Sequence, residues 1–574
     1  MKIRNLFILF VITLMTASAA FAQDNAKKID ELLKNYHDYG QFNGAVLVGE
    51  KGKIVHAKGY GMANMEWAIP VQADTKFRIG SVTKQFTAAV ILQLAAEGKI
   101  KLDGKITDYL PDYRKDTGDK VTVHQLLNHT SGIPSYTSHP DFFAKVSRNP
   151  YSVADFVKSF SSGDFEFEPG TKFKYNNSGY FLLGAIIEKV TGKTYETVLQ
   201  ERIFAPLAMT NTGYDKYAEI LPKRANGYEK TADGYRNAAY LDMSLPYAAG
   251  SLYSTVEDLY KWDQALYADK ILSAASKNLM FTPGLSQYGY GFFIAEQPIG
   301  KSGEKTKLVQ HSGGINGFNS LLTRLPDKQQ TVIILDNVGL GRYQDAITTG
   351  IVNILNNQPF DSPKKSIAET LYKTATEKSG AAAVAEYRQL KNANAAMYDF
   401  SESELNALGY QLLRSGKLKD AIEIFKLNVE MFPNAANPYD SLGEAYLADN
   451  QKESALINYK KAVALNPTNA NAVQIVNRIE GKEIKINAAV FDAYVGDYEL
   501  APNFVLTITK EGDKLFGQAT GPGQGKLQLE AVSETAFVVP AVKAEISFEK
   551  DASGKVVGLI LVQNGRTTKG KKIK

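Results

Sequence analysis

A serine and a lysine three residues apart, Ser81 and Lys84, are the first residues whose types and spacing suggest chemistry. The residues that follow, up to Glu97, place apolar side chains at helical spacing before Gly98, which predicts a helix that begins near Ser81. Residues three apart on a helix are neighbours, so the Lys84 amine can reach the Ser81 hydroxyl. Because a serine at a helix start is also a common cap, this pair alone is weak support for catalysis.

Two later clusters add a phenol, an amide and an imidazole. Tyr175 and Asn177 lie in a loop that leads into a predicted helix. His311, Gly313 and Gly314 lie at the end of a predicted strand. A serine hydroxyl is a poor nucleophile at neutral pH and needs a neighbouring base. The three clusters together therefore contain the groups that acyl transfer on a serine would need.

Three short motifs, in this order, resemble those of the penicillin-recognising serine hydrolases: Ser81-x-x-Lys84, Tyr175-x-Asn177 and His311-x-Gly313. That superfamily includes class C β-lactamases, D-alanyl-D-alanine carboxypeptidases, D-aminopeptidases and related esterases. The likeness covers residues 27–355. It implies an α+β domain of the β-lactamase/transpeptidase type over residues 23–360, in which an antiparallel sheet is flanked by helices and joined by a helical region.

The residues suggest how such a site would work. Lys84 is the nearest candidate base for Ser81, and burial would favour its neutral form by lowering its pKa. Tyr175, if close, can pass a proton between Ser81 and the leaving group. Asn177 can hold Lys84 and also bind a substrate amide. The resemblance implies that the backbone N–H groups of Ser81 and Gly314 bind the oxyanion.

The resemblance places His311, Gly313 and Gly314 in substrate binding, together with Asn177. The β-lactamases of the superfamily have a lysine where this chain has His311, and a histidine is mostly neutral at pH 7. We therefore expect hydrolysis of a D-alanyl peptide, a D-amino-acid amide or an ester. Two alternatives remain open: a class C-like β-lactamase, or a catalytically silent penicillin-binding or sensing protein that binds a partner through its repeats.

The elements that position this site form one predicted domain. A hairpin of residues 44–49 and 53–58 lies at its start, and strands at 308–311, 317–325 and 330–336 lie at its end. Helical stretches and long loops lie between them. Strands at both ends with helices between predict one antiparallel sheet that is closed by the two ends of the domain.

Three further regions follow. Residues 361–400 are rich in lysine, alanine and glutamate and are predicted to form a helical linker. Residues 401–482 repeat a pattern of small, aromatic and proline residues after 34 positions, with Phe425 matched by Tyr459, which resembles a pair of tetratricopeptide repeats. Short alternating runs with glycine turns predict a small all-β barrel or sandwich over residues 485–574.

The composition excludes several other functions. The 574 residues contain no cysteine, so disulfide scaffolds and thiolate metal sites are excluded. The 66 Lys+Arg and 61 Asp+Glu residues form no basic block, so nucleic acid is not an expected partner. The six histidines lack metal-ligand spacing, and we expect no metal and no other cofactor. His129 is expected to order a loop by hydrogen bonding.

The first 22 residues have the pattern of a secretory signal peptide. Lys2 and Arg4 precede the apolar run Leu6–Met15, and Ala20-Phe21-Ala22 forms an A-x-A cleavage site. The apolar run is shorter than the ~20 residues that span a bilayer. We therefore expect a periplasmic or secreted protein without a stable membrane span after cleavage. Its expected partners are a small-molecule or peptide substrate and an envelope protein that binds the repeats.

Overall fold

The computed structural model describes residues 24–573, except for residues 140–141, 232–233, 302, 481–487, 502–503, 521–524, 552–553 and 564–565. The predicted signal peptide of residues 1–22 lies outside the described residues. The chain divides into two compact units, Met1–Pro363 and Lys364–Lys574. Within the described part of the chain, no helix is both long enough and apolar enough to cross a bilayer.

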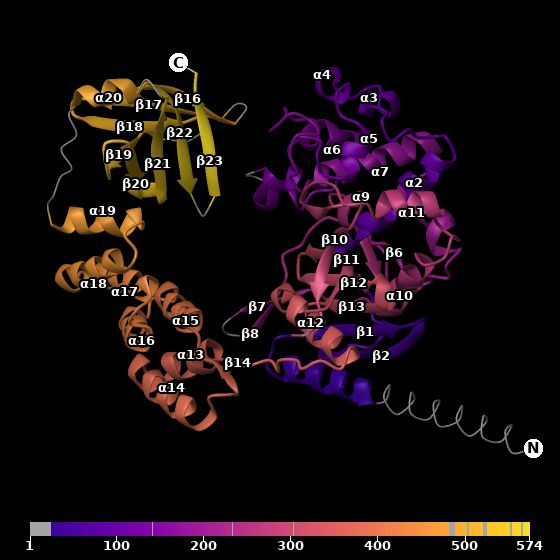
Figure 1. The fold of residues 1–574 in the computed structure, drawn as a ribbon, viewed down its shortest axis with the longest axis horizontal. Helices are drawn as coiled ribbons and strands as arrows, with labels where there is room; N and C mark the ends of the chain where they lie inside the picture. The colour runs from indigo at the N-terminus through magenta and orange to yellow at the C-terminus, as the bar shows by residue number, and fades with distance from the viewer. Residues whose placement is uncertain are drawn as a thin grey trace, which may run out of the picture. The chain divides into compact units, whose positions relative to one another are not determined.

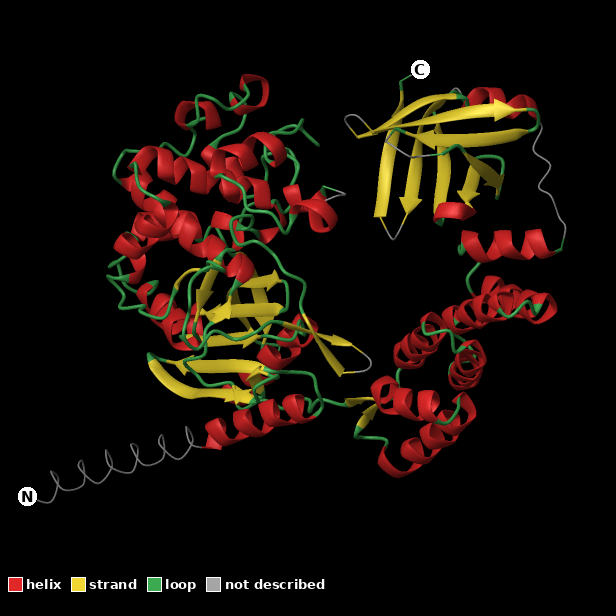
Figure 2. Ribbon diagram, turned by 180° about the vertical axis from the view of Figure 1, so that it is seen from behind, coloured by secondary structure: helices red, strands yellow, loops and turns green. Residues whose placement is uncertain are grey.

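A six-stranded antiparallel sheet with the order β10-β11-β12-β13-β1-β2 forms the centre of the first unit (Figures 1 and 2). Its strands are β1 (Gly44–Glu50), β2 (Lys53–Tyr60), β10 (Phe293–Pro298), β11 (Lys305–Ile315), β12 (Phe318–Leu325) and β13 (Gln330–Asp336). β1 pairs with β13 along its whole length, from Gly44 opposite Asp336 to Glu50 opposite Gln330. This pairing confirms the prediction that the two ends of the domain close one sheet.

Side chains of β1 alternate between two cores, as the pleat of a strand requires. Val46 faces a core that it shares with the helix of residues 24–38 and with α12 (Gln344–Leu355). Ala45 faces the larger core on the other side of the sheet. The main helices of that larger core are α2 (Thr83–Ala96), α5 (Val123–Leu127), α7 (Asn177–Thr191), α9 (Tyr247–Gly250) and α10 (Val256–Ala265).

Shorter elements complete the first unit. The strands are β3 (Met62–Asn64), β4 (Ile69–Pro70), β5 (Phe77–Arg78), β6 (Gly213–Tyr214), β7 (Tyr228–Thr231), β8 (Gly234–Asn237) and β9 (Leu252–Ser254). The helices are α3 (Ile106–Tyr109), α4 (Lys115–Gly118), α6 (Val153–Phe160), α8 (Tyr195–Leu199) and α11 (Ala274–Met280). Two short turns of other types position the site described below: the 3₁₀ turn η1 (Gly80–Val82) and the π-helical turn η3 (Phe142–Val146).

The second unit begins with helices: α13 (Ile367–Glu377), α14 (Gly380–Asn394), α15 (Glu402–Arg414), α16 (Leu418–Met431), α17 (Ala436–Ala448), α18 (Lys452–Leu465) and α19 (Ala470–Ile479). Leu371 of α13 and Tyr387 of α14 belong to the same core as Leu408 and Phe425. Residues 361–400 are therefore helical as predicted, but they are not a linker, because their apolar side chains complete the core of the repeat helices. The short strands β14 (Lys365–Ser366) and β15 (Tyr398–Asp399) pair beside them.

The 34-residue repeat has a physical basis in how paired helices meet. A Cβ atom on Gly409 would lie 2.4 Å from the Phe425 ring, and one on Gly443 would lie 2.8 Å from the Tyr459 ring. Each glycine therefore lets an aromatic side chain of the next helix pack against its backbone. The equivalent positions of the repeat make equivalent contacts, while their assignment as tetratricopeptide repeats stays a prediction.

A closed barrel of eight antiparallel strands ends the chain, preceded by α20 (Ala488–Tyr494), and confirms the predicted β domain. The strands are β16 (Gly496–Ala501), β17 (Phe504–Glu511), β18 (Lys514–Ala519), β19 (Leu527–Ala531), β20 (Ala536–Val539), β21 (Ala544–Lys550), β22 (Val556–Gln563) and β23 (Arg566–Lys572). The sequence patterns predicted neither β16 nor β23, the pair that closes the barrel. β23 has the polar sequence RTTKGKK and carries no alternating apolar pattern.

Candidate active site

Ser81 and Lys84 lie together at the start of the central helix of the first unit. Ser81 is the middle residue of η1, which runs directly into α2, and Lys84 lies in the first turn of α2. The Lys84 Nζ atom is 3.0 Å from the Ser81 Oγ atom. Ser81 is half-buried, whereas Lys84 has no exposed surface. The helical spacing therefore produces the contact that the sequence predicted.

Among the described residues, only neutral oxygen atoms contact the Lys84 amine by hydrogen bonding. Besides Ser81, Lys84 Nζ lies 2.8 Å from the Asn177 Oδ1 atom and 2.8 Å from the Ala249 carbonyl oxygen. Burial without an opposite charge lowers the pKa of the Lys84 amine well below its ordinary value. A neutral amine has two N–H donors and one lone pair, so it can donate to Asn177 and Ala249 and present its lone pair to the Ser81 hydroxyl.

Tyr175 places its ring against the same amine. The Lys84 Nζ atom is 4.9 Å from the centre of the Tyr175 ring. The Tyr175 hydroxyl is buried and makes no hydrogen bond to another described residue. Burial raises the pKa of Tyr175, and the neighbouring Ser81 hydroxyl partly opposes that effect. The phenol is therefore held in its protonated form beside Ser81 and Lys84.

Asn177 is the first residue of α7, and Asn176 caps that helix by accepting a hydrogen bond from the Gly179 N–H at 3.1 Å. With its Oδ1 atom accepting from Lys84, its Nδ2 atom donates to Thr137 Oγ1 at 3.2 Å. Asn177 is thus held between the amine and the segment that carries Thr137. The start of α7 therefore contacts the start of α2, although Lys84 and Asn177 are 93 residues apart in sequence.

His311 lies close to the site, and both of its ring nitrogens are engaged within the protein. Its Nδ1 atom donates to the Ser312 carbonyl oxygen at 2.6 Å, and its Nε2 atom accepts from the Tyr288 hydroxyl at 2.9 Å. Burial is the main cause that lowers the pKa of His311 to about 3, so its imidazole is neutral at physiological pH. The His311 ring centre lies 6.0 Å from that of Tyr175.

Gly313 and Gly314 bring β11 against η1. A Cβ atom on Gly313 would lie 2.1 Å from the Ile79 carbonyl oxygen, so only glycine allows this approach. Gly80 has a φ of +48°, and a Cβ on it would lie 3.0 Å from the Gly314 backbone nitrogen. Gly313 is buried in this contact, while Gly314 is exposed beside Ser81.

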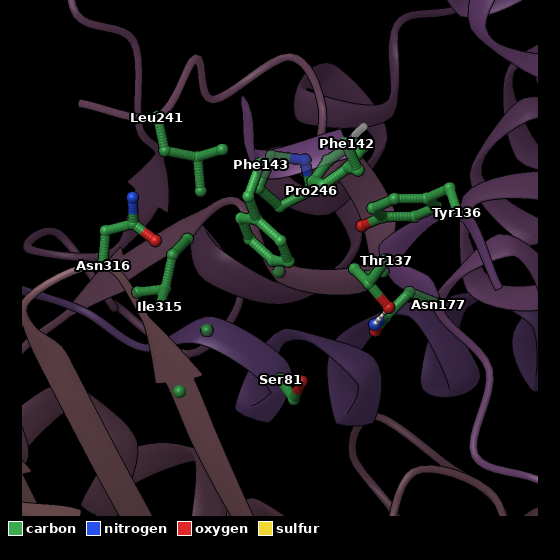
Figure 3. Close-up of a pocket in the computed structure, with 14 residues that line it drawn as sticks. Ser81, Tyr136, Thr137, Phe142, Phe143, Asn177, Leu241, Pro246, Ile315 and Asn316 are labelled. Carbon is green, nitrogen blue, oxygen red and sulfur yellow. Dashed lines mark hydrogen bonds between the residues drawn. The ribbon is translucent and has the colours of Figure 1, made fainter. Parts of the chain in front are cut away.

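Ser81 opens onto a cavity of about 290 Å³. Figure 3 shows Ser81 on one side of the cavity and Phe143 across from it, with Thr137 and Asn177 at one flank and Leu241 and Ile315 at the other. Of the predicted site residues, Ser81, Asn177 and Gly314 line this cavity. The other four, Lys84, Tyr175, His311 and Gly313, are absent from its described lining.

His129 orders the loop that carries Tyr175, as the sequence predicted. Its Nδ1 atom accepts a hydrogen bond from the Asn176 N–H at 3.1 Å, and its carbonyl oxygen accepts one from the Lys174 N–H at 3.0 Å. Its ring centre lies 4.3 Å from that of Tyr175 and 4.6 Å from that of Tyr288. Burial lowers the pKa of His129 well below its ordinary value, which keeps Nδ1 available as an acceptor.

Sequence reasoning missed three groups that hold the site. The Ala249 carbonyl accepts from Lys84, Thr137 accepts from Asn177, and Ser135 Oγ accepts from the Asn177 backbone N–H at 3.2 Å. A backbone carbonyl leaves no signature in sequence, and a serine or threonine in a loop has many ordinary uses. The described residues contain no group of three or more histidine, aspartate or glutamate side chains arranged to hold a metal ion.

The sheet, the helix that begins at Ser81 and the facing Tyr175 loop define a β-lactamase-type serine hydrolase fold. Residues 26–351 match the protein family described as Beta-lactamase, and residues 480–572 match a domain of unknown function, DUF3471. The first match covers more than half of the chain. The chain belongs to the Beta-lactamase family, and it is a serine hydrolase.

Relatives of several kinds share the first unit. Penicillin-binding protein 4* of Bacillus subtilis is 32% identical over 374 residues, which span 60% of this chain and 79% of the relative. The D-amino acid amidase of Ochrobactrum anthropi, solved with D-phenylalanine, is 27% identical, covers 58% of this chain and 99% of its own, and has a TM-score of 0.51. The hydrolase EstCE1, at 20% identity and a TM-score of 0.51 over 58% of this chain and 99% of its own, shares the fold.

Proposed function

We propose that this serine hydrolase cleaves an ester or amide through an acyl-enzyme on Ser81. The observation that carries the proposal is the buried Lys84 amine, which contacts Ser81 Oγ at 3.0 Å and has only neutral oxygen atoms as hydrogen-bond partners. Such an amine is a base rather than a structural cation. Neutral Lys84 takes the Ser81 proton while Oγ forms a bond to the substrate carbonyl carbon.

Tyr175 completes the proton transfers. Its raised pKa keeps it protonated, and its hydroxyl is buried without a described partner, so it can donate to the leaving group as the carbonyl–leaving-group bond breaks. It recovers a proton from the protonated Lys84, which restores the neutral amine and leaves Ser81 acylated. Water then attacks the acyl-enzyme, gives a proton to the same base system and releases the acid and free Ser81. Ser81 and Gly314 both line the cavity, and their backbone N–H groups are the oxyanion donors in this proposal.

His311 and Gly313 act in support of the site in this proposal. His311 holds Tyr288, and Gly313 lets β11 approach Ser81. A neutral His311 disfavours a carboxylate-bearing β-lactam, which leaves D-alanyl peptides, D-amino-acid amides and esters as substrates. The similarity to a D-amino acid amidase supports the amide among these.

Labelling with a fluorophosphonate tests the acyl-enzyme. We expect the probe to mark Ser81 in the full chain and to leave Ser81→Ala unlabelled, with loss of ester hydrolysis in that variant. Ser362→Ala is the matched control, since Ser362 is also followed three residues later by a lysine but lies outside the site. Equal hydrolysis by Ser81→Ala would refute the proposal.

We also propose that the chain is exported by the signal peptide of residues 1–22 and that the repeats of residues 401–482 bind an envelope protein. The basic, apolar and A-x-A segments support export, and helical hairpins build surfaces suited to a partner. N-terminal sequencing of the exported protein should begin at Gln23. Recovery of the same partners without residues 401–482 would exclude the second role.

A further inference from the structure

We infer that the cavity in front of Ser81 selects an apolar substrate that carries no charge near its scissile carbonyl. This inference rests on the acyl hydrolysis proposed above and narrows its substrate class: it favours uncharged esters over D-alanyl peptides and D-amino-acid amides, whose carboxylate or ammonium group lies next to the scissile bond. None of the described residues that line the cavity carries a charge. Its large side chains are apolar or aromatic: Tyr136, Phe142, Phe143, Leu241, Pro246 and Ile315.

The buried Lys84 amine and the buried His311 imidazole cannot supply a positive charge to a substrate carboxylate. Lys84 directs its amine at three oxygen atoms of the protein and is fully buried. His311 uses both ring nitrogens, one toward Ser312 and the other toward Tyr288. Neither side chain belongs to the described lining. Burial lowers the pKa of both groups, and this also disfavours their positively charged forms.

Two arginines of the same unit are bound to one carboxylate. Arg78 Nε and Arg224 Nη1 lie 2.5 and 2.8 Å from the two oxygen atoms of the buried Asp215. Neither arginine belongs to the described lining of the cavity. A carboxylate or ammonium group that entered the cavity would lose water without gaining an opposite charge, which is costly. The described polar lining, Thr137, Asn177 and Asn316, offers only neutral groups.

Adjacent phenylalanines on η3 show how the cavity presents an apolar wall. Phe142 is buried, and its ring centre lies 5.1 Å from that of Tyr136. Phe143 is 60% exposed, and Figure 3 shows its ring directed into the cavity toward Ser81. A ring that is exposed at this position gains by being covered, and an apolar acyl or leaving group would cover it.

Matched esters test the charge selectivity directly. p-Nitrophenyl hexanoate, the half ester of adipic acid and the corresponding ω-amino ester have the same chain length and differ only in a terminal methyl, carboxylate or ammonium group. We expect kcat/KM for the hexanoate to exceed both others by about 100-fold. A charged ester hydrolysed within about threefold of the hexanoate would overturn the inference.

Fluorophosphonate labelling of the same preparation distinguishes an error in the substrate class from an error in the proposed acyl-enzyme on Ser81. Labelled Ser81 combined with a preference for a charged ester would overturn the substrate class and leave the acyl-enzyme intact. An unlabelled Ser81 with hydrolysis that survives in Ser81→Ala would overturn the proposed function itself.

Substitutions at Phe143 locate the selectivity. Phe143→Arg places a cation over Ser81 and should raise the adipate-to-hexanoate ratio of kcat/KM about tenfold, while Phe143→Ala should lower kcat/KM for the hexanoate more than for the acetate ester. Trp67→Ala is the control, because Trp67 is 80% exposed and outside the cavity lining. An unchanged ratio in a Phe143→Arg protein that still labels at Ser81 would contradict the assignment of this wall.

Discussion

Two buried cationic side chains in the first unit, Lys84 and Arg324, have opposite environments. Arg324 is almost fully buried and forms an ion pair with the buried Asp263, whose second carboxylate oxygen accepts from Thr331 at 2.6 Å. Lys84 is equally buried, but its hydrogen-bond partners are a hydroxyl, an amide oxygen and a backbone carbonyl. Arg324, which stays charged, therefore has a counter-ion, whereas Lys84, which must be deprotonated to act as a base, has none.

This difference distinguishes a structural cation from a base. An arginine cannot be deprotonated at accessible pH, so burial requires a counter-ion. A lysine without a counter-ion responds to burial by becoming neutral. Each of the following predictions tests whether Lys84 and Arg324 differ in this way.

The largest effect is expected at Lys84. Lys84→Ala should lower kcat for ester hydrolysis by about 10³-fold or more, because Ser81 then lacks its base. Lys84→Arg should be about as inactive, since a guanidinium retains its proton. Steady-state kinetics on purified, folded protein measures both. A Lys84→Arg variant with more than a tenth of the wild-type rate would show that the positive charge, rather than the free base, serves catalysis.

The next effect concerns stability. Asp263→Asn should lower the free energy of unfolding by about 3 kcal/mol, because Arg324 would remain buried without its counter-ion. The double variant Arg324→Met/Asp263→Leu should recover most of that loss. Urea unfolding measures the change, and active-site titration of the folded fraction should stay near wild type. A loss below about 0.5 kcal/mol would show that this buried pair contributes no more to the free energy of unfolding than an ordinary surface ion pair does.

The pH dependence of catalysis follows from the lowered pKa of Lys84. Since the base must be neutral, kcat/KM should rise about tenfold per pH unit below that pKa and level off above it. His311, with a pKa of about 3, stays neutral over this range and should not create the rise. A pH profile of His311→Gln provides the check: if its rising limb disappears, the titrating group is His311.

The sequence predicted the parts of this site that are set by local spacing. Ser81 and Lys84 meet because helical residues three apart are neighbours, and β1 meets β13 as the strand pattern indicated. It could not predict that the Ala249 carbonyl, 165 residues beyond Lys84, completes the environment of the amine, because that contact depends on how α2 packs against α9.

The directions in which side chains point in the folded protein could not be predicted from the sequence either. The role of His311 in substrate binding stays a prediction; its imidazole contacts Tyr288, an orientation set by the packing of three aromatic residues, Tyr175, Tyr288 and Phe293, around it. Phe142 and Phe143 are identical neighbours in sequence, and only the π-helical turn decides which of them is buried and which is exposed. The polar strand β23 is stabilised by pairing with β16 and β22, a constraint that appears only when the barrel closes.

The smallest effect is the most specific test of the unpaired amine. At pH 7 an unfolded lysine is protonated, whereas folded Lys84 has a lowered pKa, so the unfolded state binds more protons and wild-type stability should rise with pH between the folded pKa and 10.5. Lys84→Met removes this dependence. The stability difference between Lys84→Met and wild type should therefore shift in favour of wild type by about 1 kcal/mol per pH unit as the pH is raised from 7 to 9.

Measuring this difference by urea unfolding at both pH values cancels the titrations that the two proteins share. The double variant Arg324→Met/Asp263→Leu should behave differently: it leaves no unpaired carboxylate, and its stability should differ from that of wild type by a similar amount at both pH values, because the arginine stays charged in the folded and unfolded states. A Lys84→Met difference that is independent of pH would mean that folded Lys84 keeps its proton. Lys84 would then be a charged side chain like Arg324, and another group would have to serve as the base for Ser81.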